Sequence, residues 1–143
     1  MLKVSQILDS KPQSAVYAVT PSQMVIEALE LMSARNIGAV MVMEGERLVG
    51  IFSERDYARK GIIQARKAKS TPLSEVMTAN VFTVGPQSSI DDCMQLMSEK
   101  KFRHLPVLDG SQVIGLISIG DVVTAIIGEQ RDHIQNLEQY ISS

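Results

Sequence analysis

Hydrophobic and polar positions recur along the chain in the same order twice. Two apolar residues precede Gly50 and again Gly115, and each glycine is followed by two more apolar residues, a serine, and an aspartate three positions after that serine. Apolar runs of β-forming residues that lead into Ser-x-x-Asp predict a strand that ends at the start of a helix. Segments 48–56 and 113–121 therefore predict the same strand-to-helix transition in both halves.

An internal duplication extends this match to most of the chain. A shift of about 65 residues places Val19 on Val84, Pro21 on Pro86, Gly45 on Gly110 and Leu31-Met32-Ser33 on Leu96-Met97-Ser98. Upstream, Val4-Ser5-Gln6-Ile7-Leu8 resembles Leu73-Ser74-Glu75-Val76-Met77, although extra residues in the first half break the register. The sequence thus predicts two copies of one structural unit.

Each copy predicts the element order β-α-β-β-α. Apolar residues at helical spacing mark the first helix of each copy: Val25, Leu29 and Met32, then Ile90, Met94 and Met97. Strands are expected at 16–19, 39–43 and 48–52, and again at 81–84, 105–108 and 113–117, with hairpin turns at 44–47 and 109–112. A unit of about 60 residues buries too little surface to be stable alone. We expect an α+β fold in which two such units pack through their sheets about a pseudo-twofold axis.

The expected boundaries are 1–66 for the first repeat, 67–72 for a linker, 73–128 for the second repeat and 129–143 for a helical tail. Gly128 predicts the end of the preceding helix. In the tail, Ile134, Leu137 and Ile141 lie at helical spacing. We expect this tail to dock on the domain or on another subunit.

Composition narrows the function. The net charge of −2 gives no general attraction to nucleic acid or anionic membranes, and nucleic-acid binding would also need aromatic residues beside a basic face, whereas the chain has no Trp and 3 Phe. Cys93 is the single cysteine, which fits a reducing compartment. No apolar run approaches the ~18 residues of a membrane span, and the start of the chain lacks a signal-peptide core. These features predict a cytoplasmic protein that acts without membrane or nucleic acid.

The Ser-x-x-Asp segments carry the candidate chemistry. Unpaired N–H groups and the helix dipole at a helix start suit a phosphate, and an aspartate in the first turn accepts hydrogen bonds from a diol such as ribose. The same pattern is close to a capping box, in which the acid reaches back to the N–H of the serine. Both interpretations hold for Ser53 with Asp56 and for Ser118 with Asp121.

Catalysis is not expected. The chain has two histidines, His104 and His133, and no Cys/His or Asp/Glu cluster has the spacing of metal ligands. No serine, histidine and acid group into a triad, and the Ser53–Asp56 pair lacks a partnering base. We expect neither an enzyme nor a catalytic cofactor.

Three features resemble the CBS-domain family, named after cystathionine β-synthase. They are the tandem repeat, the pattern Gly-h-h-Ser-x-x-Asp in each copy, where h is an apolar residue, and Arg103-His104-Leu105-Pro106-Val107 before the second hairpin. The resemblance covers about residues 2–127 and implies a stand-alone CBS pair, or Bateman module. It implies two clefts between the repeats for AMP, ADP, ATP, NAD or S-adenosylmethionine. It also implies a homodimer and a role in signal transduction through an unknown regulated protein.

The resemblance also implies ligand-binding positions. The two aspartates would hold the ribose, and the two serines and residues 103–104 would face the phosphates. The segments at 14–16 and 78–81 would line the adenine. Residues 37–39 would lie beneath the adenine in the cleft closed by Asp121. The full set is Ser14, Val16, Ile37, Gly38, Ala39, Ser53, Arg55, Asp56, Thr78, Asn80, Val81, Arg103, His104, Pro106, Ser118, Gly120 and Asp121.

Alternatives remain for these residues and for the function. Gly38-Ala39 stands where the second copy has Arg103-His104, and Gly120 replaces Arg55, so two unequal sites are expected. Arg103 also suits an exposed charge at a helix end, and His104 a partly buried structural histidine. The alternative to an adenosine sensor is a structural dimerisation module whose clefts bind nothing.

Overall fold

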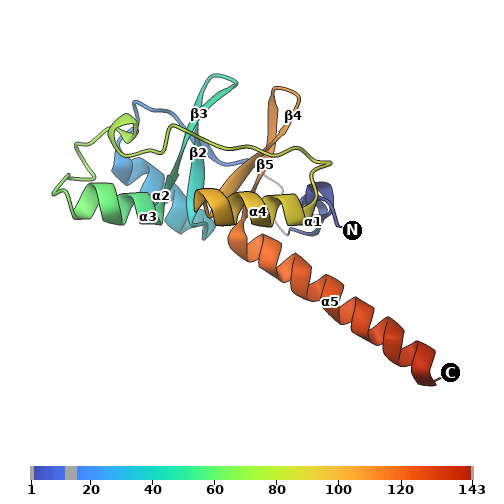
Figure 1. The fold of residues 1–143 in the computed structure, drawn as a ribbon. Helices are drawn as coiled ribbons and strands as arrows, with labels where there is room; N and C mark the ends of the chain where they lie inside the picture. Colours follow the sequence, from blue (N-terminus) through green and yellow to red (C-terminus); the bar gives the residue numbers. More distant parts are fainter. Residues whose placement is uncertain (1, 12–15, 143) are drawn as a thin grey trace. The chain divides into compact units, whose positions relative to one another are not determined.

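The computed structural model describes residues 2–11 and 16–142 (Figure 1). The helices are α1 (Val4–Ser10), α2 (Val25–Arg35), α3 (Glu54–Asp56) with a following π-helix η1 (Tyr57–Ile62), the 3₁₀ helix η2 (Leu73–Glu75), α4 (Ile90–Lys100) and α5 (Ile119–Ser142). The strands are β1 (Ala18–Val19), β2 (Ala39–Glu44), β3 (Arg47–Ser53), β4 (His104–Asp109) and β5 (Gln112–Ser118).

The chain forms two compact units from interleaved segments. Unit 1 comprises Met1–Ser14, Thr83–Gly110 and Ile114–Ser143, and unit 2 comprises Ala15–Phe82 and Ser111–Val113. The amino-terminal helix α1 therefore packs with the second repeat, and η2 packs with the first. The sequence predicts consecutive boundaries for the repeats, the linker and the tail, and this division stays a prediction. Its bounds are 1–66, 67–72, 73–128 and 129–143.

Unit 2 is built on the three-stranded sheet β1-β2-β3, in which β1 is parallel to β2 and β2 is antiparallel to β3. One face of α2 is buried through Val25, Ala28 and Met32, as its helical spacing predicts. These side chains share a core with Phe52 of β3 and with Leu73 of η2. The return segment after the linker is thus part of the hydrophobic core of the first repeat.

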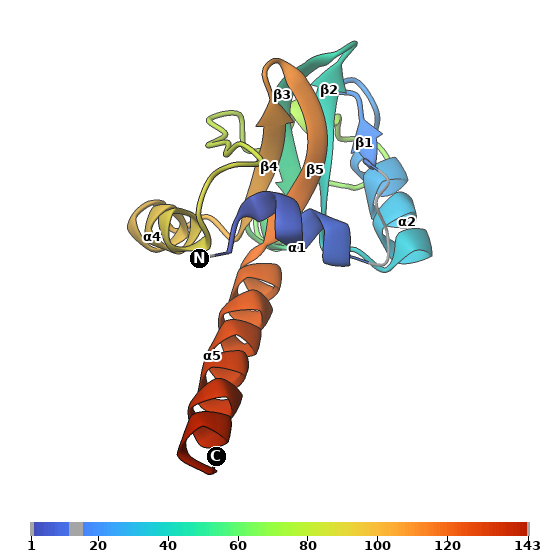
Figure 2. The same ribbon diagram turned by 90° about the vertical axis from the view of Figure 1, so that its right-hand side faces the viewer.

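Unit 1 is built on the β4–β5 hairpin and on helices from both ends of the chain (Figure 2). Val4 and Ile7 of α1 are buried in one core with Met97 of α4, Leu105 of β4 and Val122 of α5. Burial of these apolar side chains is the main force that holds α1 there. None of the helices in the described ranges is long and apolar enough to cross a membrane.

Both predicted hairpins are present and have two-residue loops. The loop between β2 and β3 begins with Gly45 at φ 60°, and the loop between β4 and β5 begins with Gly110 at φ 63°. The second loop residues, Glu46 and Ser111, do not have a positive φ, so both loops have the geometry of a type II′ turn, whose first position a glycine adopts without steric cost. The turn glycines therefore set the register of each hairpin.

The strand predicted at 81–84 is the clearest departure from the duplication. In unit 2, the Met41 N–H donates to the Tyr17 carbonyl and helps pair β1 with β2. The residue equivalent to Met41 is Pro106, which has no N–H to donate. The second copy is consequently reduced to one parallel bridge between Val84 and Val107, so the prediction of a full strand there was wrong.

The prediction that Gly128 ends a helix was also wrong, since α5 continues to Ser142. Helices α2 and α4 end at Asn36 and Lys101, which adopt left-handed conformations with φ 54° and 60°. Gly128 has no such conformation. A glycine inside a helix lowers helix stability by about 1 kcal/mol relative to alanine. The helix-forming residues around Gly128 offset this loss.

Candidate functional site

In unit 1, β5 runs into α5 through a closed capping box. The Asp121 N–H donates to Ser118 Oγ at 3.1 Å, and the Ser118 N–H donates to Asp121 Oδ2 at 2.8 Å. The capping interpretation of the sequence is therefore confirmed at this helix start. Asp121 Oδ1 accepts no hydrogen bond from the part of the chain that the structure describes.

Lys11 adds a second partner to the same carboxylate. Its Nζ lies 3.0 Å from Asp121 Oδ2 and donates to the Leu116 carbonyl at 2.8 Å. Burial raises the pKa of Asp121, but hydrogen bonds from Ser118 and Lys11 and the charge of Lys11 outweigh burial and hold the pKa below its ordinary value. Asp121 is therefore a fixed carboxylate at neutral pH.

In unit 2, β3 runs into α3 through a matching capping box. The Asp56 N–H donates to Ser53 Oγ at 3.1 Å, and Asp56 Oδ2 accepts from the N–H and hydroxyl of Ser53, both at 3.0 Å. Asp56 Oδ1 accepts the Thr78 hydroxyl at 3.1 Å and lies 3.8 Å from Lys60 Nζ. Both oxygens of this carboxylate are thus engaged within the unit.

Thr78 reaches Asp56 because its backbone pairs with β3. Two hydrogen bonds of 2.9 and 2.8 Å join Ile51 and Thr78 in an antiparallel bridge. Gly50 allows this approach, since a Cβ there would lie 2.9 Å from the Thr78 carbonyl oxygen and 2.9 Å from Met77 Sδ. The glycine of the repeated motif therefore brings a neighbouring segment against the strand that carries the serine.

Gly115 has the same role in unit 1 with a different neighbour. A Cβ there would meet the side chain of Leu8 at 2.7 Å. Leu8 belongs to α1, and the chain from α1 leads to Lys11 and its bond with Asp121. In both units, the segment that packs on the motif glycine also supplies a hydrogen-bond donor to the motif aspartate.

The chemical asymmetry predicted from the sequence lies at these helix starts. The Gly38 carbonyl accepts from the Glu54 N–H at 3.1 Å, and the Arg103 carbonyl accepts from the Ile119 N–H at 2.8 Å. Equivalent backbone bonds thus fix a glycine beside one Ser–Asp pair and an arginine beside the other. Arg103, directly before β4, is exposed, as are Gly120 at the start of α5 and Arg55 at the start of α3.

The remaining predicted positions are spread over several elements. Pro106 is buried in β4, where its carbonyl accepts from Val84, and Ala39 is buried in β2. Val16, Gly38 and Asn80 are exposed, whereas Ile37, Val81 and His104 are partly buried. Ser14 lies outside the described residues. Ligand contact by any of these residues stays a prediction.

Lys11 and Lys60 belong to the site although the sequence did not single them out. Lys60 follows Asp56 by one helical turn, a spacing from which contact could have been expected. Lys11 lies 110 residues from Asp121 along the chain, and no local pattern indicates that contact.

The described residues include no group of three or more His, Cys, Asp or Glu side chains that could hold a metal ion. Cys93 lies fully buried in α4, where burial and the charge of Asp92 raise the pKa of its thiol to about 11. A protonated, buried thiol is a core side chain and a poor nucleophile.

Comparison with known proteins agrees with this architecture. A model of the CBS domain matches the chain twice, over residues 4–62 and 73–128. The chain is 39% identical to the CBS domain-containing protein CBSX3, mitochondrial, of Arabidopsis thaliana, over 96% of this chain and 71% of that protein. It is 49% identical to a solved CBS-domain protein from Burkholderia ambifaria MC40-6, with a TM-score of 0.86 over 90% of this chain and 96% of the other.

The chain belongs to the CBS-domain family. The membership and the α+β repeat fold expected from the sequence are confirmed. CBS pairs are generally regulatory modules, which places this CBS pair in that class. YhcV of Bacillus subtilis, 36% identical over 75% of this chain and 76% of that protein, is likewise named as a CBS domain-containing protein. The cytoplasmic location of this chain stays a prediction.

Proposed function

We propose that this CBS pair is a regulatory module that binds an adenosine-containing ligand such as AMP, ADP, ATP, NAD or S-adenosylmethionine and does not transform it. The ribose hydroxyls would donate to the carboxylate of Asp121, and phosphates would meet the start of α5 and the guanidinium of Arg103. Occupancy would be reported to a regulated protein partner.

The state of Asp121 is the observation that carries the proposal. Its Oδ2 is held by Ser118 and Lys11, so the group is fixed in place and ionised. Its Oδ1 accepts no hydrogen bond from the described residues, and the side chain is 24% exposed. A fixed carboxylate with spare acceptor capacity suits a diol, because the protein need not reorganise to bind it.

The starts of α3 and α5 differ in ways that favour ligand binding at Asp121 over Asp56. Asp56 uses both oxygens within unit 2 and is only 15% exposed, so a ligand there would have to displace Thr78. The helix start of α3 also has Gly38 where α5 has Arg103. A bound phosphate would therefore meet Arg103 at the start of α5 and Arg55 at the start of α3, so the two sites would hold it differently.

The alternative is a structural module without a ligand. The closed capping boxes at Ser53–Asp56 and Ser118–Asp121 favour it, because helix capping by itself accounts for both residue pairs.

Isothermal titration with the five adenosine compounds, and with GMP and GTP, tests the proposal. We expect at least one adenosine compound to bind without turnover and Asp121→Asn to weaken binding tenfold or more, because the amide keeps an oxygen for Ser118 but loses its charge. Asp109→Asn, at the exposed end of β4, is the matched control. Absence of binding by every adenosine compound, or equal affinity of the Asp121 variant, would leave the structural module as the better account.

A further inference from the structure

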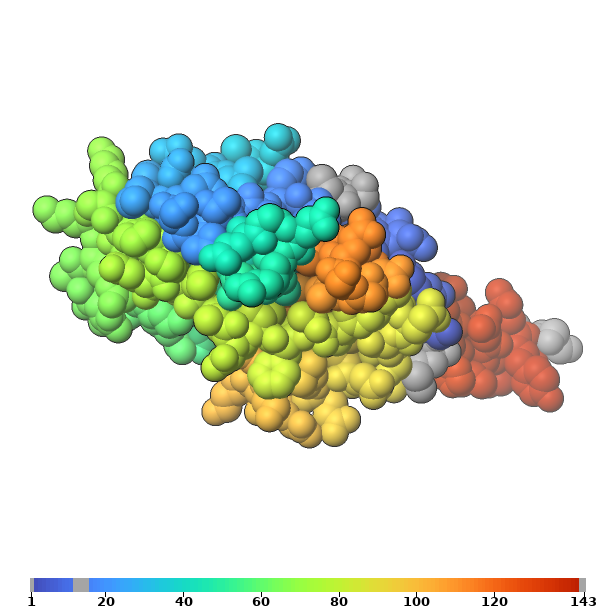
Figure 3. All heavy atoms as spheres, turned by 90° about the horizontal axis from the view of Figure 1, so that it is seen from above, coloured from blue at the N-terminus to red at the C-terminus, as the bar shows by residue number. Residues whose placement is uncertain are grey.

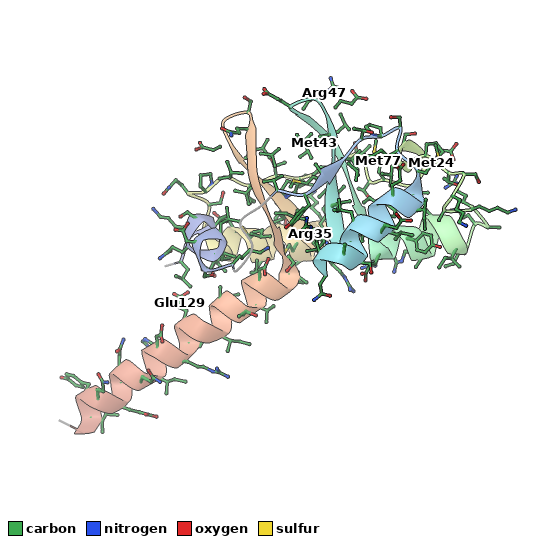
Figure 4. All side chains as sticks on the ribbon, turned by 180° about the vertical axis from the view of Figure 1, so that it is seen from behind. Met24, Arg35, Met43, Arg47, Met77 and Glu129 are labelled. Carbon is green, nitrogen blue, oxygen red and sulfur yellow. The ribbon has the colours of Figure 1, made fainter. Side chains whose placement is uncertain are left out.

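The carboxy-terminal part of α5, residues 127–141, is exposed along its whole length. Val122 is fully buried and Ile126 packs against the unit 1 core, but every residue from 127 to 141 is exposed. The ribbon of this part (red) extends away from α1, α4 and the β4–β5 hairpin (Figure 1), and its atoms stand clear in Figure 3. The side chains around Glu129 project from a bare helix (Figure 4).

This bare segment carries an apolar stripe. Ile127, Ile134 and Ile141 recur every seven residues, and Leu137 follows Ile134 by three. Their exposed fractions are 46%, 53%, 81% and 49%. Apolar residues at these intervals occupy the a and d positions of a heptad and form the seam of a coiled coil. Among residues 127–141, Gln130 is the one polar residue at those positions.

Two charged residues beside the stripe, Arg131 and Glu138, can form ion pairs with the same two residues of a second copy. Arg131 and Glu138 occupy equivalent positions, each directly after a d residue. Neither has an oppositely charged residue three or four positions away in its own helix, so neither is paired along α5. In an antiparallel helix pair these positions face each other, and Arg131 of one copy would lie beside Glu138 of the other, twice by symmetry.

We propose that α5 pairs antiparallel with α5 of a second copy of this chain through Ile134, Leu137 and Ile141. Each Ile134 packs on Leu137 of the other copy in this register, and Gln130 lies beside Ile141 at both ends of the seam. The overlap of residues 130–141 is about 18 Å long. Such a short seam gives a reversible, concentration-dependent dimer.

A membrane surface fits the same stripe less well. Helices that lie on membranes carry Lys and Arg on their polar face. The polar side of this segment has Glu129 and Asp132, and its charge is negative when Arg131 and Glu138 are included.

Sedimentation equilibrium of the full chain tests the pairing. We expect the Ile134→Glu/Leu137→Glu variant to have half the mass of the wild type at the same concentration, with an unchanged helical signal in circular dichroism. Asp132→Arg, which lies off the seam, is the control and should keep the wild-type mass.

Charge exchange tests the antiparallel register. Arg131→Glu alone and Glu138→Arg alone should each raise the dissociation constant about tenfold, since each places like charges together twice. The double variant Arg131→Glu/Glu138→Arg should restore the wild-type value. In a parallel pair the two positions do not meet, so a double variant that stays weak would overturn the register.

Equal masses for the wild type and Ile134→Glu/Leu137→Glu would overturn the pairing itself. Cosedimentation of the wild type, but not of this variant, with vesicles of anionic phospholipid would overturn it in favour of a membrane surface.

Discussion

At the scale of single residues, the carboxylate of Asp121 depends on a lysine far away in the sequence. Lys11 Nζ contacts Oδ2 at 3.0 Å, and the lysine and aspartate side chains are 30% and 24% exposed, so the pair is partly shielded from water. A partly buried ion pair of this kind stabilises more than one on an open surface. The interaction links the end of α1 to the start of α5.

Removal of the lysine should change the response to acid. The pKa of Asp121 is lowered in the fold, so its contribution to stability is present above the unfolded pKa of about 3.9 and is lost as pH falls through the folded pKa. We expect Lys11→Met to lower the unfolding free energy by about 1 kcal/mol at pH 7 and by less below about pH 4.

Thermal melts of both proteins between pH 2 and 7 measure this difference. Lys3→Met is the control, because Lys3 Nζ donates to the neutral Gln87 side chain. A difference that stays constant with pH would contradict the role of the Asp121 carboxylate.

The two motif glycines should differ in their tolerance of a methyl group. A Cβ at Gly50 meets the Thr78 backbone, which is hydrogen-bonded to β3, whereas a Cβ at Gly115 meets the flexible end of Leu8. We expect Gly50→Ala to destabilise by about 1–3 kcal/mol and Gly115→Ala by less. Denaturant melts of both variants measure the order, and a larger loss for Gly115→Ala would contradict it.

At the scale of elements, one proline accounts for the main difference between the repeats. Met41 supplies the N–H that pairs β2 with the segment before β1, and Pro106 removes it from the second copy. The apolar run at 81–84 was a sound signal for a strand, but its partner lacks the donor that the ladder needs. The prediction was wrong because the partner strand β4 has Pro106 at the pairing position, and not because of the residues at 81–84.

The exposed part of α5 should become more ordered when Gly128 is replaced. Apart from its chain neighbours and the backbone of its own helix, no atom of the described residues lies within 4 Å of a Cβ built there. Gly128→Ala should stabilise the helix by about 1 kcal/mol. Amides from 129 to 141 should then exchange with deuterium more slowly, measured against unchanged exchange in α4. Faster exchange after the substitution would mean that the glycine is needed for a local contact.

At the scale of the whole molecule, the exchange of segments between repeats makes each core depend on a remote part of the chain. Ile7 of α1 is 4% exposed in the core of unit 1, and Leu73 of η2 is fully buried in the core of unit 2. Sequence order would assign each residue to the opposite repeat.

Truncation of these residues should therefore loosen opposite halves. We expect Ile7→Ala and Leu73→Ala each to cost about 2–5 kcal/mol. Hydrogen exchange should rise first in α4 and β4 for Ile7→Ala and in β2 and β3 for Leu73→Ala. Loosening of the first repeat by Ile7→Ala would contradict the packing of α1 with the second repeat.

The sequence alone determined the duplication, the α+β fold class, both hairpins and the Ser–Asp pairs at two helix starts, because these follow from periodicity and from contacts within four residues. Tertiary structure decided that α1 packs with the second repeat and η2 with the first. It also decided that Lys11 pairs with Asp121, that the Thr78 hydroxyl donates to Asp56, and that Pro106 leaves the segment 81–84 with a single bridge. Those outcomes depend on which distant segments meet, and hydrophobic burial, which favours any apolar face that fits, leaves no local signal of the partner.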